Sequence, residues 1–310
     1  MVFQFYQLPV ELTLEIARLA ASPPLNPESD YASMYATARA LALASFNLRK
    51  AAMPHLLHTI VLNSQDSLNR FFQTLLLQKH LAAHCSRLRL DYPHLVRRVW
   101  TSQCWQPILT SANAYDLLGE ILCNADALGF TFTSYYLLYD TLGAIVCDPA
   151  EWNCRRLTFA GDNLRWNPLT STPSGIAFLR RLTHLTIWLP EDDTIGPAYV
   201  SHLDLGHRVP NWVQRVPFEF MPGLTHFAFT LVGSPRTPTT TAMVVYVLSP
   251  TLRLQHDSTV FRTWAASGDP VAYGKIVNID VMHSPEVGGK NWGMAFLKGE
   301  NDVWPTCNTD

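Results

Sequence analysis

The sequence predicts an α/β protein in which N-terminal helices precede an irregular, leucine-rich-repeat-like solenoid of short strands and helices. Two observations support this fold class. Apolar side chains recur at helical spacing through the first sixty residues. Beyond them, helical patches alternate with short runs rich in β-branched and aromatic residues. We therefore expect two parts, a helical domain at residues 1–62 and a partner-binding domain at residues 63–310.

Composition restricts the class of protein further. Of the 310 residues, 48% are hydrophobic and 15% are charged, which is opposite to the balance of a disordered chain. The formal net charge is −2, so no overall positive field is present to hold nucleic acid or an anionic membrane. Composition thus predicts a globular protein that binds neither.

The first two helices are predicted from apolar spacing and from prolines. Leu8, Leu12, Ile16 and Leu19 would share one face of a helix over residues 8–20, with Pro9 in its first turn. A second helical run, rich in Ala, Leu and Arg, covers residues 32–52. Pro54 should end it, and residues 57–62 have strand character.

The rest of the chain predicts a series of helix and strand pairs. The expected helices are 67–84, 115–125, 135–146, 174–179 and 212–220, and the strands that follow them are 88–90, 128–132, 156–159, 182–187 and 224–229, with further strands at 242–247 and 276–281.

The spacing of these strands indicates a repeat. Successive strand centres are separated by about 28 or about 42 residues in most cases, and leucine-rich repeats recur at about 20–29 residues, so the longer intervals would carry insertions. The pattern Leu182-x-x-Leu185-x-Ile187 and its counterpart at residues 224–229 also fit a degenerate leucine-rich repeat. We therefore expect a curved solenoid.

The cysteines indicate the compartment. None of the six lies in a Cys-x-x-Cys pair, residues 1–15 carry no secretory signal pattern, and no stretch of 18 apolar residues occurs. We expect reduced core thiols in an intracellular protein of the cytoplasm, the nucleus or both.

Catalytic and metal-binding motifs are absent from the sequence. No nucleophile elbow, P-loop or dinucleotide-binding fingerprint occurs. His55 and His58 could share a helix face and bind zinc, but no third ligand is evident, and we favour structural histidines. Folding could assemble Cys104, His84 and Asp91 into a nucleophile set, although their spacing does not support it. We expect no enzymatic activity, no cofactor and no metal.

Two tryptophans are candidates for partner binding. Trp166 and Trp188 lie in or beside the repeat units and could line a concave recognition surface. Plain packing in the core is the alternative interpretation.

Residues 7–62 resemble an F-box-like motif. The resemblance rests on Gln7-Leu8-Pro9-Val10-Glu11-Leu12, followed by Ile16 and Leu19, and on Leu41-Ala42-Leu43-Ala44-Ser45-Phe46-Asn47-Leu48-Arg49. The rest of the chain, including Met221-Pro222-Gly223-Leu224-Thr225-His226, is similar to F-box-like proteins of mushroom-forming fungi.

This resemblance implies the substrate-recognition subunit of a ubiquitin ligase. An F-box docks on a Skp-type adaptor, which connects it to a cullin–RING ligase, while the repeats capture an unknown target protein. The adaptor-binding residues would be Leu8, Pro9, Leu12, Ile16, Leu19, Leu41, Leu43 and Phe46. The alternative is an interaction scaffold outside any ligase, in which the helices only cap the repeats, because a solenoid also needs a cap.

Overall fold

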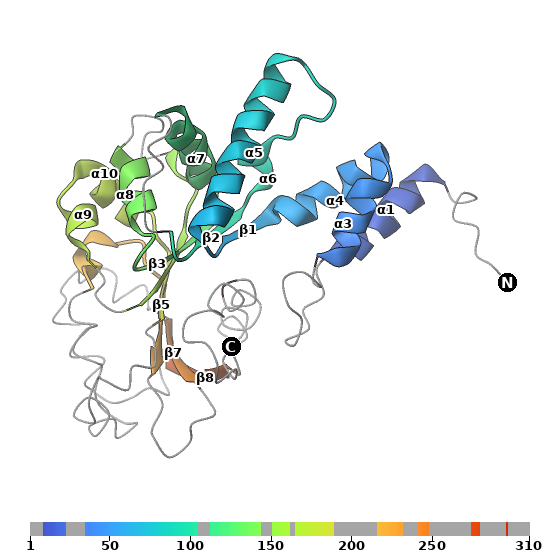
Figure 1. Ribbon diagram of the computed structural model, residues 1–310. Coiled ribbons are helices and arrows are strands. Elements are labelled where there is room, and N and C mark those ends of the chain that lie inside the picture. Colours follow the sequence, from blue (N-terminus) through green and yellow to red (C-terminus); the bar gives the residue numbers. More distant parts are fainter. Residues whose placement is uncertain are drawn as a thin grey trace.

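The computed structural model describes residues 9–22, 35–104, 112–143, 151–161, 165–188, 216–231, 241–247, 274–279 and 296. These residues form an α/β structure in which a helical module leads into a body built on one sheet (Figure 1). The α/β class predicted from the sequence is confirmed.

The helical module contains three helices: α1 (Val10–Ala21), α3 (Ala36–Ala44) and α4 (Phe46–His58). Pro9 is the N-cap of α1 and lies just outside the helix instead of in its first turn. The single run expected over residues 32–52 is broken at Ser45, whose backbone is extended. The Ser45 hydroxyl accepts a hydrogen bond from the Leu48 amide, so it caps a new helix.

Pro54 does not end the second helical run, contrary to the prediction. It lies inside α4, which continues to His58 before β1 (Thr59–Leu62) begins. Proline removes one backbone donor, which weakens a helix interior without always ending it. Leu57, buried at 7% exposure, is among the residues of this last turn that pack in the core.

The body alternates helices with strands. Its helices are α5 (Gln65–Ala83), α6 (Tyr92–Leu95), α7 (Ala112–Asn124), α8 (Tyr136–Gly143), α9 (Asn167–Thr170), α10 (Pro173–Leu179) and the 3-10 helix η4 (Phe218–Phe220). Its remaining strands are β2 (Arg98–Thr101), β3 (Ala127–Thr131), β4 (Arg156–Ala160), β5 (His184–Trp188), β6 (His226–Leu231), β7 (Thr241–Val247) and β8 (Gly274–Ile279).

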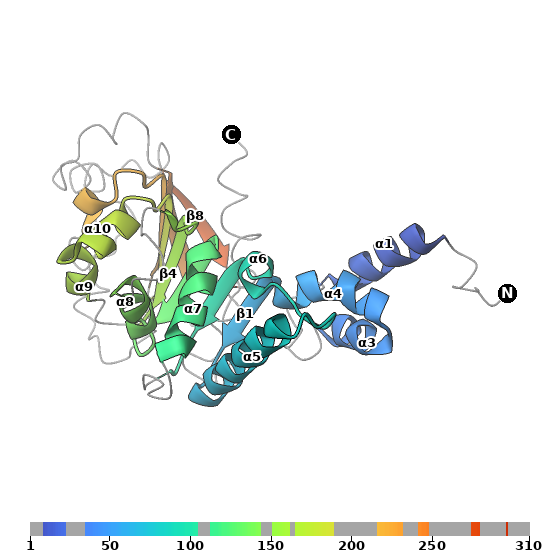
Figure 2. The ribbon, with the colours of Figure 1, turned by 90° about the horizontal axis from the view of Figure 1, so that it is seen from above.

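The described strands form one sheet in sequential order from β1 to β8. Strands β1 to β6 pair in parallel, whereas β7 and β8 continue the sheet antiparallel. When each crossover steps to the next strand in the same direction with the same hand, the connecting helices fall on one face. Figure 2 shows α5, α7, α8, α9 and α10 on one side of the sheet.

The register of the parallel strands separates two faces. Val99, Leu128, Leu157, Leu185 and Phe227 are aligned across five strands and belong to the main hydrophobic core with the helices. Neighbouring residues in each strand point the opposite way. The second face therefore carries the row formed by Arg98, Ala127, Arg156, His184 and His226, and the row formed by Trp100, Gly129, Thr158 and Thr186.

One predicted strand is wrong. Residues 88–90 form turns and irregular backbone after α5, and the second strand is β2, which begins at Arg98. Local hydrogen bonds hold the earlier segment, because the Leu88 amide bonds the Ser86 hydroxyl and the Leu90 amide bonds the Gln78 side chain. With β2 in place, the strands that start at residues 98, 127, 156 and 184 are almost evenly spaced.

The other expected elements agree more closely with the structure. Most of them correspond to an observed element with one or both ends shifted. They are the elements expected at 67–84, 115–125, 128–132, 135–146, 156–159, 174–179, 182–187, 224–229, 242–247 and 276–281. In the expected helix at 212–220, only η4 is helical among the described residues 216–220.

Four cysteines lie in the described ranges, and all four are free thiols. Cys104, Cys123 and Cys154 are buried, as expected for core residues. Cys85 is exposed after the end of α5, so the expectation of a core position is wrong for it. Cys147 and Cys307 lie outside the described residues.

Gly175 provides a test of the packing between α9 and α10. A methyl group at Gly175 would lie 2.6 Å from Leu169 Cα, whereas one at Gly143 would meet nothing within 4 Å. We predict that Gly175→Ala lowers the free energy of unfolding by about 1–3 kcal/mol through overpacking. Gly143→Ala, the control, should leave it unchanged or slightly higher. Urea denaturation of both variants measures the difference, and equal stabilities would contradict the described contact.

Candidate functional site

A stripe of large aliphatic side chains lies exposed along α1. Leu12, Ile16 and Leu19 are 52%, 41% and 60% exposed, and their spacing places them on one side of the helix. Complete burial of one such side chain contributes about 1.5–3 kcal/mol, and the described part of the fold leaves much of this stabilisation unrealised for all three residues. These three residues are called the aliphatic stripe below.

The opposite side of α1 packs on α3 and α4 through alanines. Ala17, Ala21, Ala38 and Ala52 are at most 1% exposed and occupy the interior of the module. Such small side chains let the helix backbones approach closely and leave little room between them for larger ones. The aliphatic stripe is therefore directed outward, whereas Leu14 on the alanine side is partly buried.

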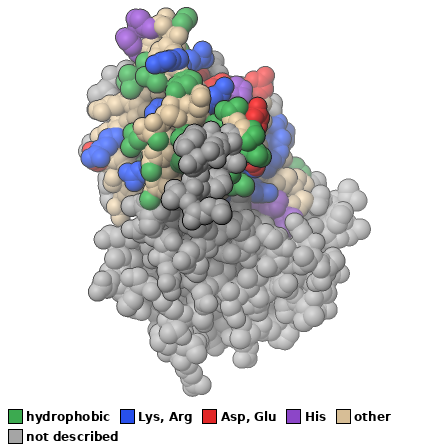
Figure 3. Space-filling model, turned by 90° about the vertical axis from the view of Figure 1, so that its right-hand side faces the viewer, with side chains coloured by type: hydrophobic (Ala, Val, Ile, Leu, Met, Phe, Trp, Pro, Cys, Tyr) green, Lys and Arg blue, Asp and Glu red, His purple; other side chains and the backbone are tan. Residues whose placement is uncertain are grey.

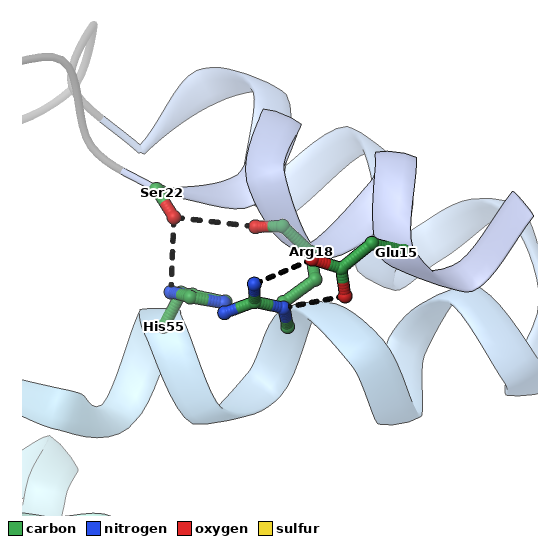
Figure 4. Close-up of polar contacts among 4 residues, drawn as sticks. All are labelled: Glu15, Arg18, Ser22 and His55. Carbon is green, nitrogen blue, oxygen red and sulfur yellow. Dashed lines mark hydrogen bonds and ion pairs between the residues drawn. The ribbon is translucent and has the colours of Figure 1, made fainter. Parts of the chain in front are cut away.

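Polar contacts brace α1 beside the aliphatic stripe (Figure 4). Arg18 donates two hydrogen bonds to the Glu15 carboxylate, at 2.8 and 2.6 Å. Both side chains are about half exposed, so this ion pair contributes little to stability. The Arg18 hydrogen bond keeps the pKa of Glu15 below its usual value, so the two charges persist at neutral pH.

Ser22 and His55 connect the end of α1 to α4. The Ser22 hydroxyl donates to the Arg18 carbonyl at 3.3 Å and lies 3.4 Å from His55 Nδ1. Burial, reinforced by the charge of Arg18, lowers the pKa of His55. His55 therefore favours its neutral form in this contact.

A second exposed apolar site lies where α3 meets α4. Leu43 is 86% exposed and Phe46 is 44% exposed. The Phe46 ring lies 5.7 Å from the guanidinium carbon of Arg87, which contributes a cation–π contact from the segment after α5. Leu41 is half-buried and packs against the alanine interior. Figure 3 views the molecule from this side, where hydrophobic side chains lie among Lys and Arg side chains.

The eight residues predicted to bind an adaptor are thus placed as follows. Pro9, Leu12, Ile16, Leu19, Leu43 and Phe46 are exposed, and Leu41 is partly covered. Leu8 lies outside the described residues. Val10, at 55% exposure, was missed, although it precedes Leu12 on the same helix and its residue type could have suggested it.

The two tryptophans proposed for partner binding do not form a described surface. Trp166 is buried at 9% exposure and packs edge-on against Phe159 in the main core. Its role is therefore packing, which corrects the prediction that it lines a recognition surface. Trp188 is the last residue of β5, and its side chain lies outside the described set.

Sequence reasoning missed the polar row on the second face of the sheet. Arg156, His184 and His226 are neighbours on β4, β5 and β6. The two imidazole rings stack almost in parallel, with centroids 4.2 Å apart. The alternation of these residues with Leu157, Leu185 and Phe227 in each strand was the available signal.

The stacked histidines share one tautomer. The Thr183 and Thr225 hydroxyls donate to backbone carbonyls, at 3.2 and 2.9 Å. Each hydroxyl oxygen therefore accepts from Nδ1 of the histidine that follows it, at 2.8 and 2.7 Å. Burial, together with His226 and Arg156, lowers the pKa of His184 to about 3, so this ring is neutral at pH 7.

The residues considered for catalysis do not come together. The Cys104 thiol contacts backbone carbonyls, including that of Ser102 at 3.2 Å, and burial raises its pKa to about 12. His84 bonds the His80 carbonyl, and Asp91 pairs with His94. The candidate set of Cys104, His84 and Asp91 is therefore not assembled.

The two histidines considered for zinc binding also have different partners. His55 contacts Ser22, whereas His58 contacts Thr59 at 3.0 Å. Within the described ranges, no three His, Cys, Asp or Glu side chains are grouped to hold a metal ion. None of the helices in those ranges is both long and apolar enough to cross a bilayer.

Comparisons with family models, curated proteins and solved structures give no match to this chain.

The low pKa of His184 predicts a dependence of stability on pH. The unfolded chain binds a proton at this histidine below about pH 6.5, whereas the folded protein resists protonation there until about pH 3. Its contribution is therefore complete above about pH 6.5 and is lost progressively as the pH falls toward 3. His184→Asn keeps an amide donor for Thr183 and should lose less stability between pH 7 and pH 4 than the wild type.

His94→Asn is the matched control, because the His94 side chain is 74% exposed beside Asp91. This variant should follow the wild-type curve when urea midpoints are measured at each pH. An identical pH dependence for His184→Asn and the wild type would contradict the described partial burial of the histidine stack.

Proposed function

We propose that this protein is the substrate-recognition subunit of a Skp–cullin–F-box-type ubiquitin ligase. The proposal rests on the aliphatic stripe of Leu12, Ile16 and Leu19. These exposed side chains stabilise a complex when a partner covers them, and large exposed apolar surfaces mark interaction sites. A Skp-type adaptor is the partner proposed for α1 and the junction of α3 and α4. The ligase enzymes bound through that adaptor would supply the chemistry.

The position of the module supports docking. Both ribbon views show α1 at the end of α4 farthest from the sheet, and α4 runs directly into β1 (Figures 1 and 2). A partner can therefore cover α1 and leave the sheet accessible to a second protein. The ion pair of Glu15 and Arg18 beside the aliphatic stripe would form part of a polar rim, which is typical of protein interfaces.

We further propose that the body is a degenerate leucine-rich-repeat-like solenoid that binds the target protein. Its support is a ladder of backbone hydrogen bonds where the strands begin. The amides of Asp126, Arg155, Thr183 and Thr225 each donate to the carbonyl of the preceding unit, at 2.7, 3.0, 2.8 and 2.8 Å. Equivalent positions thus recur from one unit to the next, as stacked repeats require.

The alternative function, a scaffold outside any ligase, assigns the helices a capping role. A cap would direct its largest apolar side chains onto the first repeat unit. Leu12, Ile16 and Leu19 are instead exposed on α1, which favours docking over capping.

The docking proposal predicts that a charge on α1 weakens adaptor binding. Leu19→Asp places a carboxylate where an apolar contact is expected, and we expect the affinity for a purified Skp-type adaptor to fall at least about tenfold. Leu77→Asp on α5 is the matched control, because Leu77 is 54% exposed and Leu19 is 60% exposed. Biolayer interferometry with the full chain measures both variants.

Retained affinity in Leu19→Asp, or no measurable binding by the wild type, would count against the proposed docking. An equal loss in Leu77→Asp would place the adaptor on a different surface. Circular dichroism of each variant checks that the helices remain folded.

A further inference from the structure

A slot on the second face of the sheet holds a residue from the far end of the chain. Arg98 and Trp100 project from β2 to this face, and Gly129 of β3 is paired with Trp100. Phe296, which is only 4% exposed, lies in the slot. Its ring centroid is 5.3 Å from that of Trp100 and 4.7 Å from the guanidinium carbon of Arg98.

Gly129 leaves room for the Trp100 ring and, beside it, for the Phe296 ring. A Cβ atom at Gly129 would clash with the Trp100 ring and lie 3.0 Å from Phe296 Cδ2. The backbone of Gly129 does not have a positive φ, so its conformation does not require glycine. The requirement at this position is room for the Trp100 ring, which forms one wall of the slot, and for the Phe296 ring beside it.

Arg98 recognises two features of the same residue. Its guanidinium lies over the Phe296 ring, and its Nη2 donates a hydrogen bond to the Phe296 carbonyl. Arg98 is only 6% exposed, and a buried cation needs such partners to offset its lost hydration. The slot therefore selects a flat ring together with the main-chain carbonyl of the residue that bears it.

These two features are present in any peptide segment with an aromatic residue. We propose that the slot formed by Arg98, Trp100 and Gly129 is a peptide-binding site for such a segment of a partner protein, and that Phe296 occupies it in cis until the partner displaces it. This inference deepens the proposed function, on which it rests, since it assigns the target protein an aromatic anchor.

Competition within the chain sets the expected affinity. A residue tethered to the same chain acts at an effective concentration that can reach the millimolar range. The apparent affinity for a separate peptide is then reduced by the fraction of molecules in which the slot is vacant. Removing the Phe296 side chain should raise that fraction and strengthen binding of an aromatic peptide.

The test uses a fluorescein-labelled peptide with the sequence of residues 291–300, Asn-Trp-Gly-Met-Ala-Phe-Leu-Lys-Gly-Glu. Fluorescence anisotropy measures its binding to the full chain. We expect Phe296→Ala to bind it at least about tenfold more tightly than the wild type does. Should Phe296→Ala fail to fold, Phe296→Leu keeps most of the apolar volume, removes the ring over Arg98 and is held to the same expectation.

Two controls locate the binding in the slot. Gly129→Val in the Phe296→Ala background drives a side chain into the Trp100 ring that forms one wall of the slot, and it should abolish the gain. A peptide with alanine in place of both Trp292 and Phe296 should not bind. Equal affinity of wild type and Phe296→Ala, a gain that survives Gly129→Val, or binding of the alanine peptide would each overturn the proposal.

Adaptor binding measured on the same variants separates this inference from the proposed function. Phe296→Ala leaves α1 unchanged, so it should bind a Skp-type adaptor as the wild type does. If Phe296→Ala binds the peptide no more tightly than the wild type but still binds the adaptor, the slot proposal alone is rejected. If Phe296→Ala binds the peptide more tightly than the wild type but neither protein binds the adaptor, the slot proposal is supported and the ligase proposal is rejected.

Discussion

The alanine interior of the helical module is the constraint on which the proposed docking surface depends. Ala17, Ala21, Ala38 and Ala52 allow α1, α3 and α4 to pack closely, and the aliphatic stripe of α1 is left outside. A helix with alanines inside and leucines outside buries little apolar area by itself. A partner that covers the outer side would therefore stabilise both the complex and the module.

The common register of β1 to β6 has a comparable role in the body. Because equivalent residues align across the strands, each strand sends one set of side chains to the helix-side core and the other to the second face. The core set is aliphatic and aromatic, whereas the second face combines arginine, histidine, threonine and tryptophan. Arg98 and the stack of His184 on His226 follow from this alternation.

The sequence predicted the elements whose side-chain pattern is decided locally. Helix α5 and strands β3, β4 and β5 were found because apolar spacing and β-branched runs mark them. Strand β2 was missed because Leu88 and Leu90 alternate like a strand, although local hydrogen bonds hold them in turns. Pro54 was misjudged because packing of the last turn of α4 outweighs one lost hydrogen bond.

Candidate sites were harder to predict because they depend on contacts between distant residues. Exposed residues of α1 could be named from the helical face, but Trp166 could be assigned to the core only once Phe159 was seen beside it. The slot around Arg98 joins β2 to Phe296, which no local pattern connects.

The most direct measurement of the central claim is hydrogen exchange of the full chain with and without a purified Skp-type adaptor. The account predicts added protection in α1 and at the junction of α3 and α4, whereas no change there, or protection confined to β2 to β5, would contradict it.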